Sequence, residues 1–103
     1  MQRICFTFEL ASGQEEEYDR RHQEVWPELV AELRAAGVSN YTIFRRGRTV
    51  IGYAECEPNA ATAFGRVART EVNKRWNEWF SGVIVNLRDD GGLATVPEVW
   101  HLP

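Results

Sequence analysis

The stretch Arg3-Ile4-Cys5-Phe6-Thr7-Phe8-Glu9-Leu10 places a large apolar side chain at every second position. Successive side chains of a β-strand point to opposite faces of a sheet, so this alternation predicts a strand with one buried face and one open face. The chain is therefore expected to begin with an amphipathic strand that needs a sheet around it.

Two further alternating runs, residues 40–45 and 49–57, predict a pair of neighbouring strands. The short segment Arg46-Gly47-Arg48 between them is suited to a hairpin turn. Gly52, together with Ala54, leaves little side chain on one face of the second run, which allows another group to approach that face closely.

Helical patterns fill the interval between the first strand and the hairpin. Three acidic residues at 15–17 favour a helix start, and the helical period then continues to Trp26. Pro27 cannot continue a helix without losing a backbone donor, so we expect a break there and a second helical segment from Pro27 to residue 36. Gly37 is expected to end that segment.

The second half of the chain repeats the alternation of helix and strand. Residues 60–68 and 71–83 predict two helical stretches, the second with apolar side chains at helical spacing. Residues 86–95 are polar and predict a loop, and residues 97–102 predict a short last strand.

The order strand, helix, strand, strand, helix, strand indicates an α+β fold of ferredoxin-like βαββαβ type, in one domain over residues 1–103. It has a four-stranded antiparallel sheet with helices on one face. The other face carries too many large apolar groups to meet water, so we expect a ligand or a second subunit to cover it.

Composition excludes several classes of protein. Twelve basic residues against fifteen acidic ones leave a net charge of -3, which argues against a nucleic-acid partner. The one basic cluster, Arg45, Arg46 and Arg48, is interpreted as a solvated turn without a partner.

No apolar stretch is long enough to cross a membrane, and the start of the chain has no signal-like segment, so we expect a cytoplasmic protein. Cys5 and Cys56 are expected to be free, buried thiols.

Three residues spaced four apart, Tyr18, His22 and Trp26, would form one stripe on a helix. Imidazole can give or take a proton near neutral pH, and aromatic faces beside it suit a polyhydroxylated ring with apolar edges. The alternative interpretation is ordinary amphipathic packing. The expected topology brings Tyr41 and Trp76 to the same surface, which favours a site.

Other aromatic and histidine positions favour structural roles. Trp26 is expected to pack beside the helix break, Trp79 and Phe80 to lie in the core, and His101 to belong to a strand or an interface. His22 and His101 are far apart in sequence and have no carboxylate at ligand spacing, so we expect no metal site.

Four segments carry a resemblance to a known family. They are Glu17-Tyr18-x-Arg20-Arg21-His22-x3-Trp26-Pro27-Glu28-Leu29, Asn40-Tyr41-x-Ile43, Lys74-Arg75-Trp76 and the ending Glu98-Val99-x-His101-Leu102-Pro103. With these segments the chain resembles the L-rhamnose mutarotases over nearly its full length. The resemblance implies a homodimer with the dimeric α/β-barrel arrangement of ferredoxin-like chains, acting on a monosaccharide.

The resemblance also implies roles for single residues. His22 would donate a proton to the sugar, Tyr18, Tyr41 and Trp76 would contact the substrate, and no metal or organic cofactor would be needed. Interconverting α and β anomers requires ring opening, with one proton delivered to the ring oxygen and one removed from the anomeric hydroxyl. The second proton-transfer partner stays open among Tyr18, Tyr41 and a bound water.

The chain departs from the family at two places. Asn77 follows Trp76 where the family commonly has a second tryptophan, and residues 87–92 replace an Asn/Pro-containing loop. We expect Asn77 to contact the substrate by hydrogen bonds instead of stacking. The sugar could therefore be L-rhamnose, L-fucose or another aldose.

Two other functions are compatible with the same pattern. A small haem- or quinol-type monooxygenase resembles this architecture and also uses a histidine and a tryptophan, and fold alone does not exclude it. A non-catalytic sugar-binding or interaction domain is the other alternative.

Overall fold

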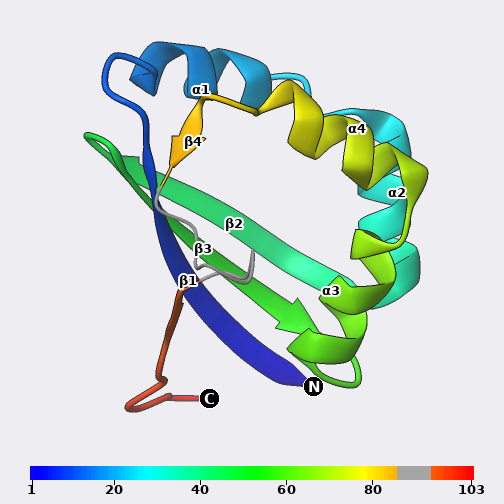
Figure 1. Cartoon of the computed structure of the whole chain (residues 1–103). Helices are drawn as coiled ribbons and strands as arrows, with labels where there is room; N and C mark the ends of the chain where they lie inside the picture. Colours follow the sequence, from blue (N-terminus) through cyan, green and yellow to red (C-terminus); the bar gives the residue numbers. More distant parts are fainter. Residues whose placement is uncertain (86–93) are drawn as a thin grey trace.

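The computed structural model describes residues 1–85 and 94–103. Figure 1 shows a sheet whose one side is lined by the four helices found in these ranges. In chain order the elements are β1 (Gln2–Leu10), α1 (Glu15–His22), α2 (Pro27–Ala36), β2 (Val38–Arg46), β3 (Thr49–Cys56), α3 (Ala60–Ala68), α4 (Glu71–Trp79), β4 (Ile84–Val85) and β5 (Ala94–Val96).

The sheet has the order β2-β3-β1-β4, and β5 also pairs with β1. All of these pairings are antiparallel. β2 and β3 form the predicted hairpin, in which Arg46 faces Thr49 across the turn. The α+β class and the ferredoxin-like arrangement predicted from the sequence are confirmed. None of the helices within the described ranges combines the length and apolarity that a membrane crossing requires.

The prediction of a last strand over residues 97–102 is wrong, because the chain has no strand after Val96. The fourth position of the sheet is instead shared by β4 and β5, which lie along the same edge of β1. β4 pairs with residues 9–10 and β5 with residues 5–7 of β1. These short strands thus form where β1 has unpaired backbone N–H and C=O groups. The alternation of apolar and polar side chains in residues 97–102 does not determine where the last strand lies.

The predicted loop over residues 86–95 is also changed. Residues 94 and 95 belong to β5, and residues 86–93 lie outside the described part of the chain.

The first helix is shorter than the sequence predicts. α1 ends at His22, and Trp26 has an extended backbone with φ -57° and ψ 128°, as expected for a residue before proline. α2 begins at Pro27 and is followed by Gly37, which has φ 103°, so the predicted second helix is confirmed at both ends. The break leaves His22 at the end of a helix rather than in its middle.

The last helix also ends early, at Trp79 rather than near residue 83. The carbonyl of Val83 accepts a hydrogen bond of 2.8 Å from the backbone N–H of Ala11, at the end of β1. The helix ends at Trp79 because the chain then returns to the edge of β1. The helical spacing of apolar residues does not predict this return.

The core lies between the helices and the face of β1 that carries Phe6, Phe8 and Leu10. In β3, Gly52 is paired with Phe6 of β1. The phenyl ring lies so close to the backbone of Gly52 that an added Cβ would be 2.2 Å from its Cζ. The close approach that the small residues of β3 allow is thus made by Phe6. Tyr18 and Phe80 complete this cluster from α1 and from the end of α4.

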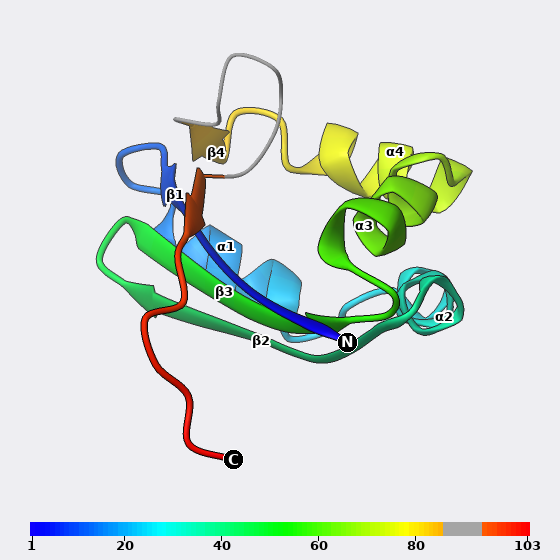
Figure 2. The same cartoon turned by 90° about the horizontal axis from the view of Figure 1, so that it is seen from below.

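The opposite face of the sheet carries no helix among the described residues. Phe44, Ile51 and Thr7 lie side by side on it in neighbouring strands, and Phe44 is 61% exposed. Figure 2 shows the C-terminal segment extending away from the helices, and Trp100 in that segment is 78% exposed. An apolar surface of this kind is typical of a surface that another molecule covers.

The two cysteines are both free, as predicted, although only Cys56 is fully buried. The pairing of β1 with β3 sets Cys5 opposite Tyr53 and Cys56 opposite Gln2, so the thiols do not face each other.

Candidate functional site

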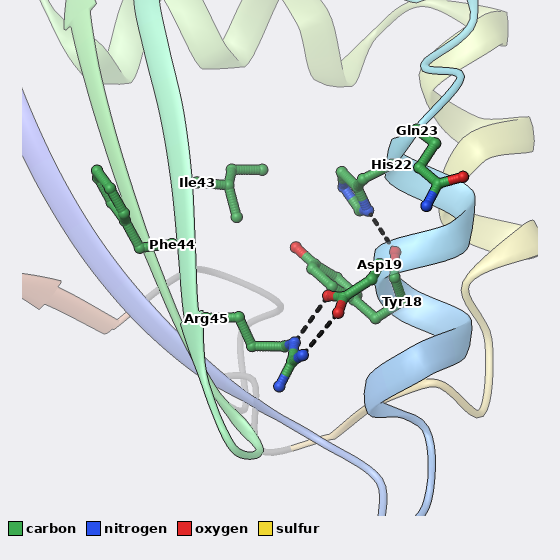
Figure 3. A pocket seen from close by; sticks show the side chains of 7 residues that line it. All are labelled: Tyr18, Asp19, His22, Gln23, Ile43, Phe44 and Arg45. Carbon is green, nitrogen blue, oxygen red and sulfur yellow. Dashed lines mark hydrogen bonds and ion pairs between the residues drawn. The ribbon is translucent and has the colours of Figure 1, made fainter.

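A cavity of about 480 Å³ opens between α1 and β2. This volume lies within the range of about 300–1,000 Å³ that is typical of small-molecule sites. Figure 3 shows the side chains that line it, some from the helix and some from the strand; the ring of Phe44 points away from α1. They are Tyr18, Asp19, His22, Gln23, Ile43, Phe44 and Arg45.

His22 stands at the end of α1, half-buried at the cavity wall. Its Nδ1 lies 3.0 Å from the carbonyl oxygen of Tyr18. A carbonyl oxygen only accepts, so this bond assigns the proton of the neutral ring to Nδ1 and leaves Nε2 as an acceptor. Burial lowers the pKa of His22 from its ordinary value, against smaller opposing effects of the Tyr18 carbonyl and Asp19. The resting imidazole is thus neutral and can accept a proton at Nε2.

Tyr18 lies one helical turn before His22, and its ring is almost fully buried. The ring packs edge-on against Phe8 and Phe80, with centroid distances of 6.1 and 5.7 Å. Within the described chain no hydrogen bond holds its hydroxyl, and in Figure 3 this oxygen points toward β2. Burial raises the pKa of Tyr18 well above its ordinary value, so the phenol keeps its proton.

Tyr41 lies on β2, where a bulge between Ser39 and Thr42 shifts the register of pairing. Its ring packs edge-on against Phe6 and Phe64, at 6.1 and 5.9 Å. The side chain is 37% exposed, yet the hydroxyl is surrounded by enough protein that burial raises its pKa to about 12. Tyr41 is not among the cavity-lining residues.

Trp76 comes to the same place from α4. Its indole stands edge-on to the imidazole of His22, with 5.5 Å between centroids, and edge-on to Trp26 at 5.0 Å. Of the residues expected on one surface, Tyr18, His22 and Trp76 pack together, although Trp76 does not line the cavity. Trp26 lies beyond the end of α1 and contacts Trp76, and Tyr41 packs against Phe6 and Phe64 instead.

The expected packing roles are only partly found. Phe80 is buried in the core as predicted, but Trp79 is 36% exposed and stacks on Trp26 at 5.3 Å. Trp79 lies at the last position of α4, where the apolar face of the helix runs out to the surface. Arg21 covers this indole, with its guanidinium carbon 4.8 Å from the ring centroid. Trp26 has the packing role expected for it.

Asn77 is exposed on α4, next to Trp76. It does not line the cavity between α1 and β2, and its role toward a substrate stays a prediction.

Three polar residues of the cavity wall were not singled out from the sequence: Asp19, Gln23 and Arg45. Arg45 lies in β2, just before the predicted turn, and its guanidinium forms two hydrogen bonds with the carboxylate of Asp19, at 2.7 and 2.6 Å. Asp19 directly follows Tyr18 and Arg45 lies two positions after Ile43, which is the only signal that the sequence carries for them.

In residues 1–85 and 94–103, no group of three or more His, Cys, Asp or Glu side chains is placed to hold a metal ion. The expectations that the site needs no metal and no organic cofactor stay predictions.

The family model described as L-rhamnose mutarotase matches residues 3–102 of this chain. Proteins named L-rhamnose mutarotase from Oceanobacillus iheyensis and Opitutus terrae are 34% and 38% identical to it, each alignment covering 99% of both chains.

Two solved structures have a similar backbone. An L-rhamnose mutarotase from Formosa agariphila matches with a TM-score of 0.79 and 25% identity, covering 100% of both chains. The tetracenomycin F2 cyclase from Streptomyces glaucescens matches with a TM-score of 0.61 and 18% identity, also over 100% of both chains, and at that identity shares the fold alone.

Proposed function

The chain belongs to the L-rhamnose mutarotase family, and we propose that it interconverts the α and β anomers of L-rhamnose or a related 6-deoxy-sugar. The observation that carries the proposal is the imidazole of His22 at the wall of a cavity of ligand size, with Nδ1 bonded to the Tyr18 carbonyl and Nε2 in no hydrogen bond to the described part of the chain. Membership of this family favours an isomerase over the monooxygenases of similar architecture.

The first chemical step that we assign to His22 is removal of the proton from the anomeric hydroxyl. Nε2 accepts this proton, the bond between C1 and the ring oxygen breaks, and the electron pair of that bond goes to the ring oxygen, which takes up a proton. Rotation about the C1–C2 bond and the reverse steps then give the other anomer. The imidazolium formed in the first step is the proton donor in ring closure, so one residue acts as base and as acid.

The group that protonates the ring oxygen is a phenol or a water molecule. The raised pKa values of Tyr18 and Tyr41 make full transfer of a phenolic proton costly. We therefore assign both tyrosines as hydrogen-bond donors that hold the sugar, with water as the carrier of the second proton. Trp76 and Asn77 are proposed as further substrate contacts from α4.

A direct test follows the exchange between the two anomers of L-rhamnose labelled at C1 by NMR saturation transfer. The chain is expected to increase the exchange rate in proportion to protein concentration, and L-fucose measured in parallel gives the preference between the sugars. If the protein leaves the uncatalysed rate of every aldose in such a panel unchanged, the proposed activity is wrong.

We also infer that the chain forms a homodimer through the open face of its sheet. The exposed ring of Phe44 and the exposed side chains of Val99, Trp100 and Leu102 in the C-terminal segment support this proposal, since a second copy would remove them from water. Light scattering is expected to give twice the mass of 11.8 kDa at micromolar concentration, and Phe44→Glu to shift it toward one chain. A monomer mass for the unchanged protein would contradict the dimer. The cytoplasmic location stays a prediction.

A further inference from the structure

The ion pair between Asp19 and Arg45 forms one wall of the same cavity as His22. The two residues come from α1 and β2 and are 26 positions apart in the chain. In Figure 3 the pair lies at one end of the group of side chains, with the imidazole of His22 and the side chain of Ile43 at the other end and the phenolic oxygen of Tyr18 between them. A ring that presents its anomeric carbon to His22 would extend toward this pair.

The pair is held in a fixed orientation. Arg45 donates from Nε to Oδ1 of Asp19 at 2.7 Å and from Nη2 to Oδ2 at 2.6 Å. The remaining guanidinium nitrogen, Nη1, donates to the carbonyl oxygen of Gly47 at 2.8 Å, which ties the guanidinium to the hairpin turn. Two-point pairs of this kind have a defined geometry, unlike the point charge of a lysine.

The pair keeps hydrogen-bonding capacity for a ligand. An arginine has five N–H donors and an ionised carboxylate has about four acceptor positions, so the three bonds formed leave donors on Arg45 and acceptors on Asp19. The side chains of Arg45 and Asp19 are 25% and 47% exposed, so part of each reaches solvent at the cavity wall. Two neighbouring hydroxyl groups of a sugar, each of which can donate and accept a hydrogen bond, match the remaining donors of Arg45 and acceptors of Asp19.

We propose that Asp19 and Arg45 bind two adjacent hydroxyl groups of the sugar, on the side of the ring away from the anomeric carbon. The inference rests on the proposed mutarotase activity and adds to it a pair of specificity-determining residues. The hydroxyls in question are O3 and O4, the ring hydroxyls farthest from C1. L-Rhamnose and L-fucose differ in the orientation of O2 and of O4, so a pair that binds O4 would contribute to the choice between them.

The test is a cycle between enzyme variants and sugars that lack one hydroxyl. Anomer exchange is measured for wild type and Asp19→Asn with L-rhamnose and with its 3-deoxy and 4-deoxy analogues. With L-rhamnose, Asp19→Asn is expected to lower exchange at subsaturating sugar roughly ten- to a hundredfold, as for a lost hydrogen bond to a charged group. With the analogue that lacks the contacted hydroxyl, the same substitution should cost about threefold or less.

Arg45→Gln, measured in the same way, is a second variant in case Asp19→Asn does not fold. Glu16→Gln is the matched control, because Glu16 is an exposed carboxylate on the same helix that does not line the cavity. It is expected to leave exchange of all three sugars unchanged.

The outcomes separate the two proposals. Equal losses for all three sugars would assign the pair a purely structural or electrostatic role and overturn the inference, and so would no loss at all, while the mutarotase activity would stand. If wild type exchanged none of the sugars, the proposed function would be wrong and the inference with it.

Discussion

The imidazole of His22 lies against the phenol ring of Tyr18, with 4.2 Å between the ring centroids and 31° between the ring planes. The same pair is joined a second time, by the bond between Nδ1 of His22 and the carbonyl oxygen of Tyr18. One residue of α1 therefore fixes both the orientation of the histidine and the nitrogen that carries its proton.

Anomer exchange should lose its catalysed component as the pH falls. The neutral imidazole is the base, and burial lowers the pKa of His22, so the acidic limb should have its midpoint below about 6.5, the ordinary value for histidine. Asp19 is the anion that raises this pKa, and Arg45 is its cationic partner. Asp19→Asn removes the anion and leaves the cation, so the limb should move to still lower pH. A limb that moves upward in Asp19→Asn, in exchange rates measured between pH 4 and 8, would contradict the assignment.

Tyr18→Phe keeps the ring that packs against His22, Phe8 and Phe80 and removes only the hydroxyl. We expect the melting temperature to change little and exchange to fall roughly tenfold, the usual effect of one neutral hydrogen bond. The loss should be smaller than that of removing the imidazole. If Tyr18→Phe abolished exchange completely while the protein stayed folded, the phenol would be the second proton-transfer group and not only a hydrogen-bond donor.

Asn77→Trp should change the preference between sugars. An added indole beside Trp76 would offer a stacking surface worth about 1 kcal/mol, which corresponds to roughly fivefold in the ratio of L-rhamnose to L-fucose exchange. The ratio is measured on mixtures of both sugars with the same protein sample. The same ratio for wild type and variant would show that position 77 does not face the sugar.

Gly52→Ala tests the packing beneath the site. An added Cβ would meet the ring of Phe6, which in turn packs against Tyr41, so the substitution should lower the free energy of unfolding by about 1–3 kcal/mol in urea titrations. Gly65→Ala is the matched control, because nothing lies within 4 Å of its added Cβ and the residue is in α3. That variant should be stabilised by up to about 1 kcal/mol. Equal effects of the two substitutions would contradict the close contact.

Much of the fold could be predicted from local patterns. The alternation in β1 and in the β2–β3 hairpin, and the effect of Pro27 on the residue before it, are all short-range signals, and the structure confirms the elements that they predict. The last strand was misplaced because β4 and β5 form where the edge of β1 offers hydrogen bonds, and that edge is distant in sequence.

The site shows the same division. The stripe of Tyr18 and His22 follows from helical spacing, and Trp76 from topology. The pairing of Asp19 with Arg45 does not, because a charge in a helix and a charge at the end of a strand carry no local sign that they will meet. The sequence also does not show whether other side chains cover the apolar face of α4 at its last turn. For this reason the helical spacing alone predicts Trp79 in the core, although it is partly exposed.

The catalytic role of His22 is tested by anomer exchange of His22→Ala, followed by NMR saturation transfer and accompanied by a thermal melt. His22 is half-buried at the cavity wall, so removing it should leave the fold intact, while loss of the acid–base group should cost roughly two to four orders of magnitude in the catalysed rate. Glu16→Gln in the same helix should exchange at the wild-type rate. A His22→Ala protein that melts like wild type and exchanges L-rhamnose anomers at the wild-type rate would contradict the mechanism.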